Sequence, residues 1–228
     1  MNLIRNLLFS FIFYSGTISF FVFFSPVSFF SDKFVVLLSN IWARWVLCMA
    51  RLILGIKYEI EGKENIPKSG VFLIASNHQS AWETFFLGSF FVGSVFILKD
   101  ELRSIPIFSN YLKRLGFIFI KRKNAFNSLK VVLRSIEDLI GKGKRMFIVF
   151  PEGTRLQPGE RVKINTGVFA IHKFIGMPIL PIKHDSGEYW KKNGFLRRKG
   201  TIKITIFPLI EKEISKKTVI RTLEKYYY

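Results

Sequence analysis

The chain has little cysteine, little histidine and few acidic residues. Of its 228 residues only Cys48 is a cysteine, so no intramolecular disulfide can form, and we expect this small side chain to be buried among hydrophobic neighbours. Only 16 residues are acidic against 35 Lys and Arg, which leaves a formal charge of +19 that a polyanion must balance. Hydrophobic residues make up 49% of the chain, more than a nucleic-acid-binding module needs. The composition therefore favours anionic membrane lipids and phosphorylated substrates as partners and predicts no nucleic-acid partner.

Charge is absent from a long N-terminal stretch. No charged residue lies between Asn6 and Ser31, and residues 7–24 would span about 27 Å as a helix, close to the thickness of a hydrocarbon core. A cleaved signal peptide is an alternative, although the run is long for one. A second apolar stretch, 34–56, contains Arg44 and Arg51, which suit a helix lying in the membrane interface. We therefore predict that residues 1–56 form a membrane anchor followed by an interfacial helix. Whether the first segment crosses the membrane or returns to the same side stays open, because basic residues flank it on both sides.

Beyond residue 56 the sequence alternates between short strand-like runs and helical periodicity. Branched and aromatic residues mark six predicted strands, at 71–75, 95–98, 117–120, 146–150, 179–182 and 202–207. Between the third and fourth, apolar residues recur at helical spacing over 129–140, with Asn124 as a candidate cap and Gly141 as a stop. This alternation predicts one α/β domain over residues 57–228, with a largely parallel or mixed sheet covered by helices. The basic loop 190–200 suits an anionic membrane surface and a solvated surface equally.

The first candidate for chemistry directly follows a predicted strand, in the segment NHQSAWE at 77–83. The imidazole of His78 can take a proton from a hydroxyl, and the carboxylate of Glu83 can hold the ring in the required tautomer. Five positions along an ideal helix rotate two side chains about 140° apart, so His78 must lie in the turn that enters the helix. We expect that helix to begin near Ser80, with Ser76 or Asn77 as its cap. Taken alone, such a pair is equally a structural surface pair.

Two further segments carry groups that suit a phosphate. FPEGTR at 150–155 follows another strand: Gly153 permits a tight turn close to a ligand, and Arg155 offers a planar fork of donors. On its own this is also the pattern of a turn with a solvated arginine. GFIFIKR at 116–122 ends a strand with Lys121 and Arg122, at the carboxyl edge where open sheets bind ligands. Two cations there suit a phosphate monoester.

Other reactive side chains fit catalysis poorly. Ser80 is only two residues from His78, and no Gly-x-Ser-x-Gly turn exists. The consecutive residues 184–186 (His-Asp-Ser) should point in different directions and not form a triad. His172 lies in a predicted helix, where a structural role is expected. No set of His, Cys and carboxylates has metal-ligand spacing, so we predict no metal site.

Four segments, taken in order, resemble the motifs of the lysophosphatidic acid acyltransferase family within the glycerolipid acyltransferase group. They are NHQSAWE, GFIFIKR, FPEGTR and, at 177–182, MPILPI. The resemblance covers about residues 71–182 and implies that group's α/β fold, a mixed sheet covered by helices and preceded by N-terminal membrane helices. The one departure is Glu83, where the family's His-x4-Asp motif has an aspartate, which is one methylene shorter.

The resemblance also implies a direct acyl transfer. His78, oriented by Glu83, would remove the proton of an acceptor hydroxyl whose oxygen attacks a thioester carbonyl. Acyl-CoA or an acylated acyl carrier protein would be the co-substrate, with no cofactor. Pro178, Ile179 and Pro181 would lie on the acyl side, although a plain buried strand explains them equally well. The residues implied to hold the acceptor's glycerol phosphate are Lys121, Arg122, Glu152, Gly153, Thr154 and Arg155, with Glu152 orienting a cation or a hydroxyl.

The activity expected from this resemblance is that of a 1-acyl-sn-glycerol-3-phosphate O-acyltransferase of phospholipid biosynthesis. It would act on a lysophospholipid acceptor at the bacterial inner membrane, with the active site on the cytoplasmic face. The same motifs would serve another lysolipid acceptor, such as a lyso-ornithine lipid. A different class, a non-catalytic basic protein of the membrane surface, predicts salt-sensitive binding that is indifferent to His78.

Overall fold

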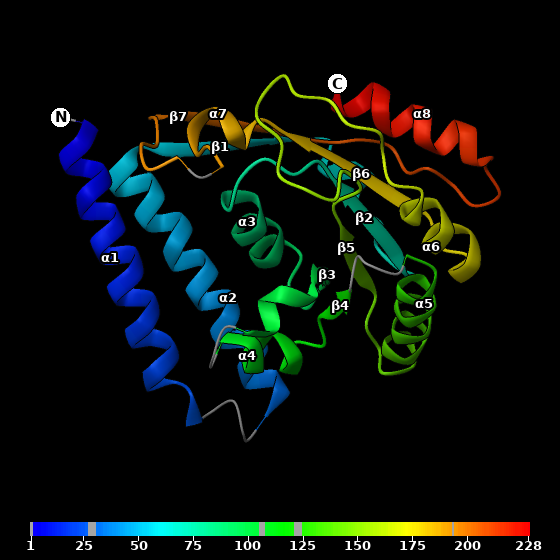
Figure 1. Ribbon diagram of the computed structural model, residues 1–228, viewed down its shortest axis with the longest axis horizontal. Helices are drawn as coiled ribbons and strands as arrows, with labels where there is room; N and C mark the ends of the chain where they lie inside the picture. Colours follow the sequence, from blue (N-terminus) through cyan, green and yellow to red (C-terminus); the bar gives the residue numbers. More distant parts are fainter. Residues whose placement is uncertain (1, 27–30, 105–107, 121–124, 193) are drawn as a thin grey trace.

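A seven-stranded mixed sheet lies at the centre of the molecule (Figure 1). The computed structural model describes residues 2–26, 31–104, 108–120, 125–192 and 194–228, and within these the strand order is β1-β7-β6-β2-β5-β3-β4. Neighbouring strands are parallel except β6 and β7. The mixed α/β fold predicted from the sequence is therefore confirmed. The strands are β1 (Ile56–Glu61), β2 (Phe72–Ser76), β3 (Val95–Lys99), β4 (Ile118–Ile120), β5 (Met146–Val149), β6 (Ile179–His184) and β7 (Gly200–Ile206).

All six predicted strands are present, within two residues at most ends, but β1 was not among them. Its sequence alternates apolar Ile56, Tyr58 and Ile60 with charged residues, the pattern of a half-exposed strand. The alternation was missed because Ile56 also ends the preceding apolar stretch. β1 pairs with β7 alone and so forms an edge of the sheet.

Two hydrophobic layers cover the two faces of the sheet. Because successive strand residues point to opposite faces, Phe72 and Ile74 of β2 pack on one side, and Leu73 and Ala75 on the other. The first layer contains α3 (Trp82–Phe90) together with residues of the N-terminal helices, and the second contains α5 (Ala125–Gly141), α6 (Gly167–Ile175) and α8 (Lys216–Tyr227). Figure 1 shows these two groups of helices on opposite sides of the sheet. The remaining short helices are η3 (Lys63–Asn65), η4 (Asp100–Ser104), α4 (Phe108–Arg114) and α7 (Ser186–Tyr189).

Helix α5 confirms the predicted helical periodicity. It buries Val132 and Ile136 against the sheet and leaves Val131 exposed, as expected for an amphipathic helix on one face. It ends at Gly141 as predicted. The proposed cap, Asn124, lies outside the described residues.

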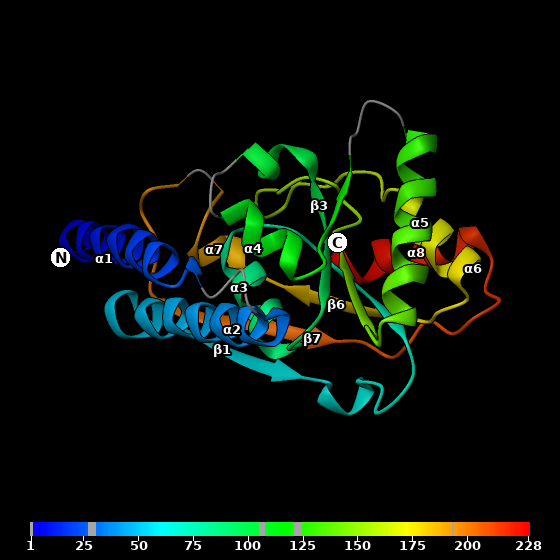
Figure 2. The same ribbon diagram turned by 90° about the horizontal axis from the view of Figure 1, so that it is seen from below.

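The N-terminal region is a pair of helices lying side by side (Figures 1 and 2). Helix α1 spans Asn2–Phe23, and α2 spans Asp32–Met49 and continues as the π-helical turn η2 (Ala50–Leu54). Gly55 ends this helix with a left-handed φ of 72°, a conformation that glycine adopts at little cost. Two segments, Leu3–Phe23 and Asp32–Leu54, are long and apolar enough to cross a membrane. These helices are compatible with a membrane protein, while the predicted division into an anchor and an interfacial helix stays a prediction.

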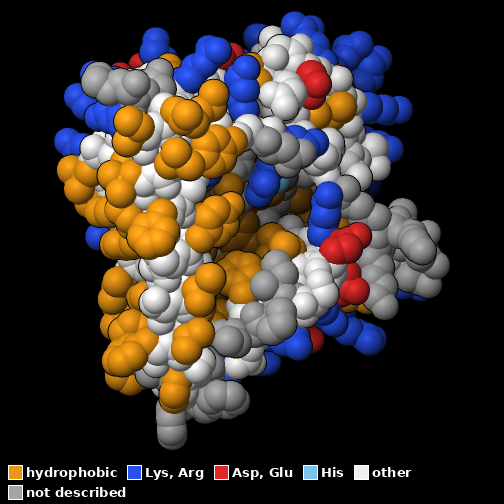
Figure 3. Space-filling view, turned by 60° about the vertical axis from the view of Figure 1, so that its left-hand side comes forward, with side chains coloured by type: hydrophobic (Ala, Val, Ile, Leu, Met, Phe, Trp, Pro, Cys, Tyr) orange, Lys and Arg blue, Asp and Glu red, His pale blue; other side chains and the backbone are white. Residues whose placement is uncertain are grey.

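These helices expose a continuous apolar surface, which we call the apolar ridge. It is visible as the hydrophobic band in Figure 3. Cys48 is also exposed on α2, contrary to the expectation of burial, because it lies on the side of that helix turned away from α3 and the sheet. The exposed large side chains of α1 and α2 are Leu3, Ile4, Leu7, Leu8, Phe11, Tyr14, Ile18, Val22, Phe23, Phe34, Leu37 and Ile41.

Candidate active site

Three segments meet where the central parallel strands end. β2 pairs in parallel with both β5 and β6, so the residues that follow these strands emerge at the same edge of the sheet. The backbone of His78 bonds to the loop after β5: its N–H donates to Glu152 Oε2 at 2.6 Å, and its carbonyl accepts from the Leu156 N–H at 2.8 Å. The amide side chain of Asn77 pairs with the backbone of His184 at 2.8 and 2.9 Å. Segments that are 70 to 110 positions apart are therefore joined by direct hydrogen bonds.

His78 and Glu83 face each other, with Nδ1 and Oε1 2.8 Å apart. His78 lies in the turn before α3, as predicted, but the predicted helix start near Ser80 is wrong, since α3 begins at Trp82. The predicted caps are wrong as well: Ser76 is the last residue of β2, and the side chain of Asn77 holds β6. The later start is explained by the Ser80 hydroxyl, which accepts from the Trp82 N–H at 2.9 Å. Glu83 consequently sits in the first turn of α3 and folds back into the loop.

The carboxylate of Glu83 is fully buried and surrounded by donors. Besides His78 it accepts hydrogen bonds from the backbone N–H groups of Gln79 and Ser80, at 3.0 and 2.9 Å, and from the hydroxyls of Ser80 and Ser186, both at 2.8 Å. A buried charge is tolerated when its oxygens are saturated in this way. The extra methylene of Glu83 is thus accommodated by a loop that wraps the carboxylate.

This environment keeps Glu83 ionised. Burial acts to raise the pKa of Glu83, but the neighbouring His184 and His78, together with the Ser186 hydroxyl, outweigh it, and the pKa lies well below its ordinary value. An ionised carboxylate at Nδ1 selects the tautomer of His78 in which Nδ1 carries the proton and Nε2 is free to accept one. The described part of the chain offers Nε2 no hydrogen-bond partner. The ring is half-buried and stacks on Phe150, with centroids 4.0 Å apart.

Residues 184–186 do not form a triad, as predicted, but two of them belong to the site. Asp185 accepts from the backbone of Lys203, away from the histidine. Ser186 supplies a donor to Glu83, and His184 is buried with Nε2 2.9 Å from the Asn77 carbonyl. Burial lowers the pKa of His184 and the nearby Glu83 carboxylate opposes that shift, while the contact with Asn77 supports a structural role. No local sequence pattern predicts these contacts, because they depend on β6 lying beside β2.

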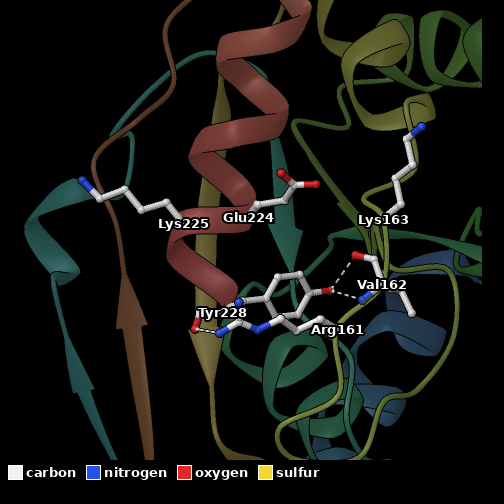
Figure 4. Close-up of a pocket in the computed structure, with 6 residues that line it drawn as sticks. All are labelled: Arg161, Val162, Lys163, Glu224, Lys225 and Tyr228. Carbon is white, nitrogen blue, oxygen red and sulfur yellow. Dashed lines mark hydrogen bonds between the residues drawn. The ribbon is translucent and has the colours of Figure 1, made fainter.

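The side chain of Glu152 holds the backbone of the His78 loop. One carboxylate oxygen accepts the His78 N–H, and the other lies 3.4 Å from the hydroxyl of Tyr228. Burial raises the pKa of Glu152 to about 7. In Figure 4 the ring of Tyr228 reaches from the end of α8 to the backbone of Val162. The pocket drawn there is separate from the His78–Glu83 pair, because neither residue is among those that line it.

The predicted phosphate-binding turn lies beside the histidine. Gly153 has a φ of 70° and donates its N–H to the Phe150 carbonyl at 2.9 Å, which closes the tight turn expected there. Thr154 and Arg155 are half-buried. The Arg155 guanidinium forms no ion pair with any acidic side chain that the structure describes. Figure 3 shows a hollow next to the apolar ridge, with a histidine in it and Lys and Arg side chains at its rim.

The other predicted site residues are placed only in part. Lys121 and Arg122 lie outside the described residues; β4, which precedes them, ends at the same edge of the sheet as β2 and β5. Pro178 and Ile179 lie at the start of β6, where Ile179 pairs with Leu73 in the buried sheet, and Pro181 lies further along the strand. A role of these residues on the acyl side stays a prediction. Among the described residues no three His, Cys, Asp or Glu side chains gather into a metal site.

His172 is structural, as expected. It is buried in α6, and its Nδ1 lies 2.7 Å from the carbonyl of Met177, which follows the helix.

Comparisons with known proteins agree with this geometry. Residues 57–185 match the family model described as Acyltransferase. A 1-acyl-sn-glycerol-3-phosphate acyltransferase of Pseudomonas aeruginosa is 38% identical over 198 residues, 87% of this chain and 75% of the relative. A protein of the same name from Borreliella burgdorferi is 28% identical, over 76% of this chain and 70% of its own length. The crystal structure of a 1-acyl-sn-glycerophosphate acyltransferase from Thermotoga maritima superimposes with a TM-score of 0.80 and 26% identity, covering 99% of this chain and 96% of the other. The chain belongs to the acyltransferase family and is an enzyme of that class.

Proposed function

We propose that this enzyme transfers a fatty acyl group from an acyl thioester to the free sn-2 hydroxyl of lysophosphatidic acid, producing phosphatidic acid. The observation that carries the proposal is the His78–Glu83 pair. The Nε2 atom of His78 has no partner in the described structure, and the His78 backbone bonds to the turn that carries Arg155, which forms no ion pair among the described residues. A base for the hydroxyl and a cation for the phosphate are the two requirements of this acceptor. The relatives carrying this activity in their names add support.

The reaction follows from the tautomer that Glu83 selects. Nε2 of His78 accepts the proton of the acceptor hydroxyl while the oxygen attacks the thioester carbonyl. The tetrahedral intermediate then breaks the carbon–sulfur bond, and the departing thiolate takes the proton back from the imidazolium. The products are an ester and a free thiol, so no acyl-enzyme is required. Glu83 stays ionised throughout and stabilises the imidazolium in the intermediate.

The donor and the location are part of the same proposal. The thioester is acyl-CoA or an acylated acyl carrier protein, and the reaction needs no cofactor beyond it. Because both carriers are cytoplasmic, the site faces the cytoplasm at the bacterial inner membrane. The apolar ridge supports this placement, since the exposed hydrophobic side chains of α1 and α2 suit contact with a bilayer. The high positive charge suits anionic lipids at that surface.

The test is an acyl-transfer assay with membranes that contain the wild type or the His78→Ala variant. Labelled acyl-CoA and acylated carrier protein are supplied separately as donors, and the acceptors are lysophosphatidic acid, a lysophosphatidylcholine and a lyso-ornithine lipid. We expect label in phosphatidic acid with the wild type and a loss of at least about 10³-fold with His78→Ala. Transfer to another lysolipid in preference would change the acceptor, and unchanged turnover in His78→Ala would end the assignment of the base.

A further inference from the structure

The loop between α7 and β7 contains one lysine unlike its basic neighbours. Lys191, Arg198 and Lys199 are exposed, whereas Lys192 is half-buried. Its ammonium donates a hydrogen bond to the carbonyl oxygen of Arg155 at 2.8 Å. The sequence placed Lys192 only in a basic loop, but the fold brings it to the predicted phosphate-binding turn, 37 positions away.

One peptide unit connects this ammonium to the histidine. The carbonyl that accepts from Lys192 belongs to Arg155, and the N–H of the same peptide, on Leu156, donates to the His78 carbonyl at 2.8 Å. Two hydrogen bonds and the width of a peptide place the ammonium no more than about 8 Å from the His78 carbonyl. The Lys192 ammonium and the backbone of His78 therefore bond to opposite edges of the same peptide, in the turn that carries Arg155.

Among the described residues, no acid compensates the charges of Lys192 and Arg155. Neither forms an ion pair with a carboxylate in the part of the chain that is described. The acidic side chains of the site are engaged otherwise: Glu83 by its donors, and Glu152 by the His78 backbone. The Lys192 ammonium has three N–H donors, of which one is used by the Arg155 carbonyl. The ammonium lies at the backbone of the residue that carries the second cation, and two cations at one turn are stabilised by an anion that carries more than one charge.

The loop that carries Lys192 is fastened to α1. The Arg197 guanidinium lies between two rings, 4.9 Å from the centroid of Phe9 and 4.5 Å from that of Trp190. The backbone of Arg197 pairs with the amide of Asn6, whose Oδ1 accepts at 2.8 Å and whose Nδ2 donates at 3.2 Å. Cation–π contacts and paired hydrogen bonds of this kind hold a loop in one position. The lysine is therefore presented to the turn by contacts with α1.

We propose that Lys192 binds the acceptor: together with Arg155 it holds the phosphate monoester of lysophosphatidic acid. The inference rests on the proposed function and assigns a specificity role within it. A phosphate monoester offers two charges to the two cations, while the phosphodiester of a lysophospholipid with a larger headgroup offers one. Lys192 therefore favours the monoester over the diester.

The test is steady-state kinetics of Lys192→Gln, with acceptor and donor varied separately. Losing one charge-assisted hydrogen bond should raise the KM for lysophosphatidic acid about 10- to 100-fold, with the KM for the donor and kcat within about 3-fold. Lys192→Arg keeps the charge and should restore most of the acceptor affinity. Lys217→Gln, at an exposed position in the first turn of α8, removes the same charge elsewhere and should leave all three constants unchanged.

A purely structural role would give a different pattern. If Lys192 only held the Arg155 turn, Lys192→Gln would lower the thermal midpoint and raise the KM for monoester and diester lysolipid acceptors by the same factor, and the inference would be overturned. An unchanged acceptor KM with full activity would overturn it too. If Lys192→Gln does not fold, Lys192→Met and the wild type are compared for inhibition by glycerol 3-phosphate, and at least about tenfold weaker inhibition of the variant is expected. Equal inhibition of a stable Lys192→Met would overturn the inference. Wild-type enzyme that does not acylate lysophosphatidic acid defeats the proposed function itself, which is a separate result.

Discussion

The two halves of the site differ in how their charges are balanced. On the acidic side, Glu83 is fully buried and accepts hydrogen bonds from five donor groups on four residues of its own chain. On the basic side, Arg155 and Lys192 are half-buried and have no acidic partner among the described residues. The charge of the acidic half is thus balanced by groups of the protein itself, whereas the charges of the basic half have no counter-ion among the described residues. The first half therefore fixes the histidine before substrate arrives, and the second provides charge that only a substrate can neutralise.

This difference predicts two kinds of failure on mutation. A change on the acidic side leaves buried donors without an acceptor, so it should lower both stability and kcat. A change on the basic side removes an exposed or half-exposed charge that makes no internal ion pair, so it should affect acceptor binding alone.

The largest effect is expected for Glu83→Gln. The amide cannot accept from all five donors, and it no longer holds His78 in the tautomer with a free Nε2. We expect kcat to fall on the order of 10³-fold and the free energy of unfolding to fall by about 2–4 kcal/mol. The measurements are turnover with lysophosphatidic acid and the thermal midpoint. Glu59→Gln, at an exposed position of β1, is the control. Turnover above a tenth of the wild type would show that the acidic half does not control the base.

The next effect is expected for Arg155→Gln, on the other half of the comparison. The KM for lysophosphatidic acid should rise about 30- to 100-fold, because a bidentate contact with the phosphate is lost. The thermal midpoint and the donor KM should not change, since the guanidinium has no internal ionic partner in the described structure. Arg221→Gln on the exposed side of α8 removes an equal charge as the control. A fall in kcat at unchanged acceptor KM would contradict the division between the two halves.

A smaller effect is expected for Ser186→Ala, which removes one of the five donors to Glu83. Losing a buried hydroxyl that bonds to a carboxylate should cost about 1–2 kcal/mol of stability and lower kcat about 3- to 10-fold. Ser89→Ala removes a comparably buried hydroxyl that bonds only to the Phe86 carbonyl, so it should spare kcat. Equal kcat values for the two variants would mean that the donor from β6 is dispensable.

Whether a feature of the fold or of the site could be predicted from the sequence depends on how far apart along the chain the contacting residues lie. Runs of branched residues predicted six strands, and the five-residue spacing of His78 and Glu83 predicted that the histidine lies in a turn. Local signals suffice where the partners are close in sequence. Helix α3 begins two residues later than predicted because the Ser80 hydroxyl, rather than Ser76 or Asn77, accepts from the first N–H of the helix, that of Trp82.

Contacts between distant segments could not be predicted. Ser186 reaches Glu83 across 103 positions, and Lys192 reaches Arg155 across 37, only because β6 pairs with β2 and the following chain returns over the site. Nothing in the local sequence distinguishes these residues from a solvated serine or lysine. For Glu152, whose role toward a cation or a hydroxyl stays a prediction, no sequence signal indicates that its carboxyl also accepts the His78 N–H.

The last prediction concerns Glu152, whose buried carboxyl has a pKa of about 7 in the folded enzyme against an ordinary value of 4.5. The folded state therefore binds this proton more tightly than the unfolded state does. The stabilisation that results is fully present below pH 4.5 and is lost as the pH rises to about 7. Over that range the free energy of unfolding should fall by about 1–3 kcal/mol. Glu152→Gln keeps an acceptor for the His78 N–H and does not titrate, so its thermal midpoint should decline less than that of the wild type between pH 5 and 8. Tyr228→Phe, which removes the second partner of this carboxyl, should shift the wild-type decline without abolishing it. Parallel profiles for the wild type and Glu152→Gln would show that this carboxyl is ionised throughout the range, and the support beneath His78 would then be a charged one.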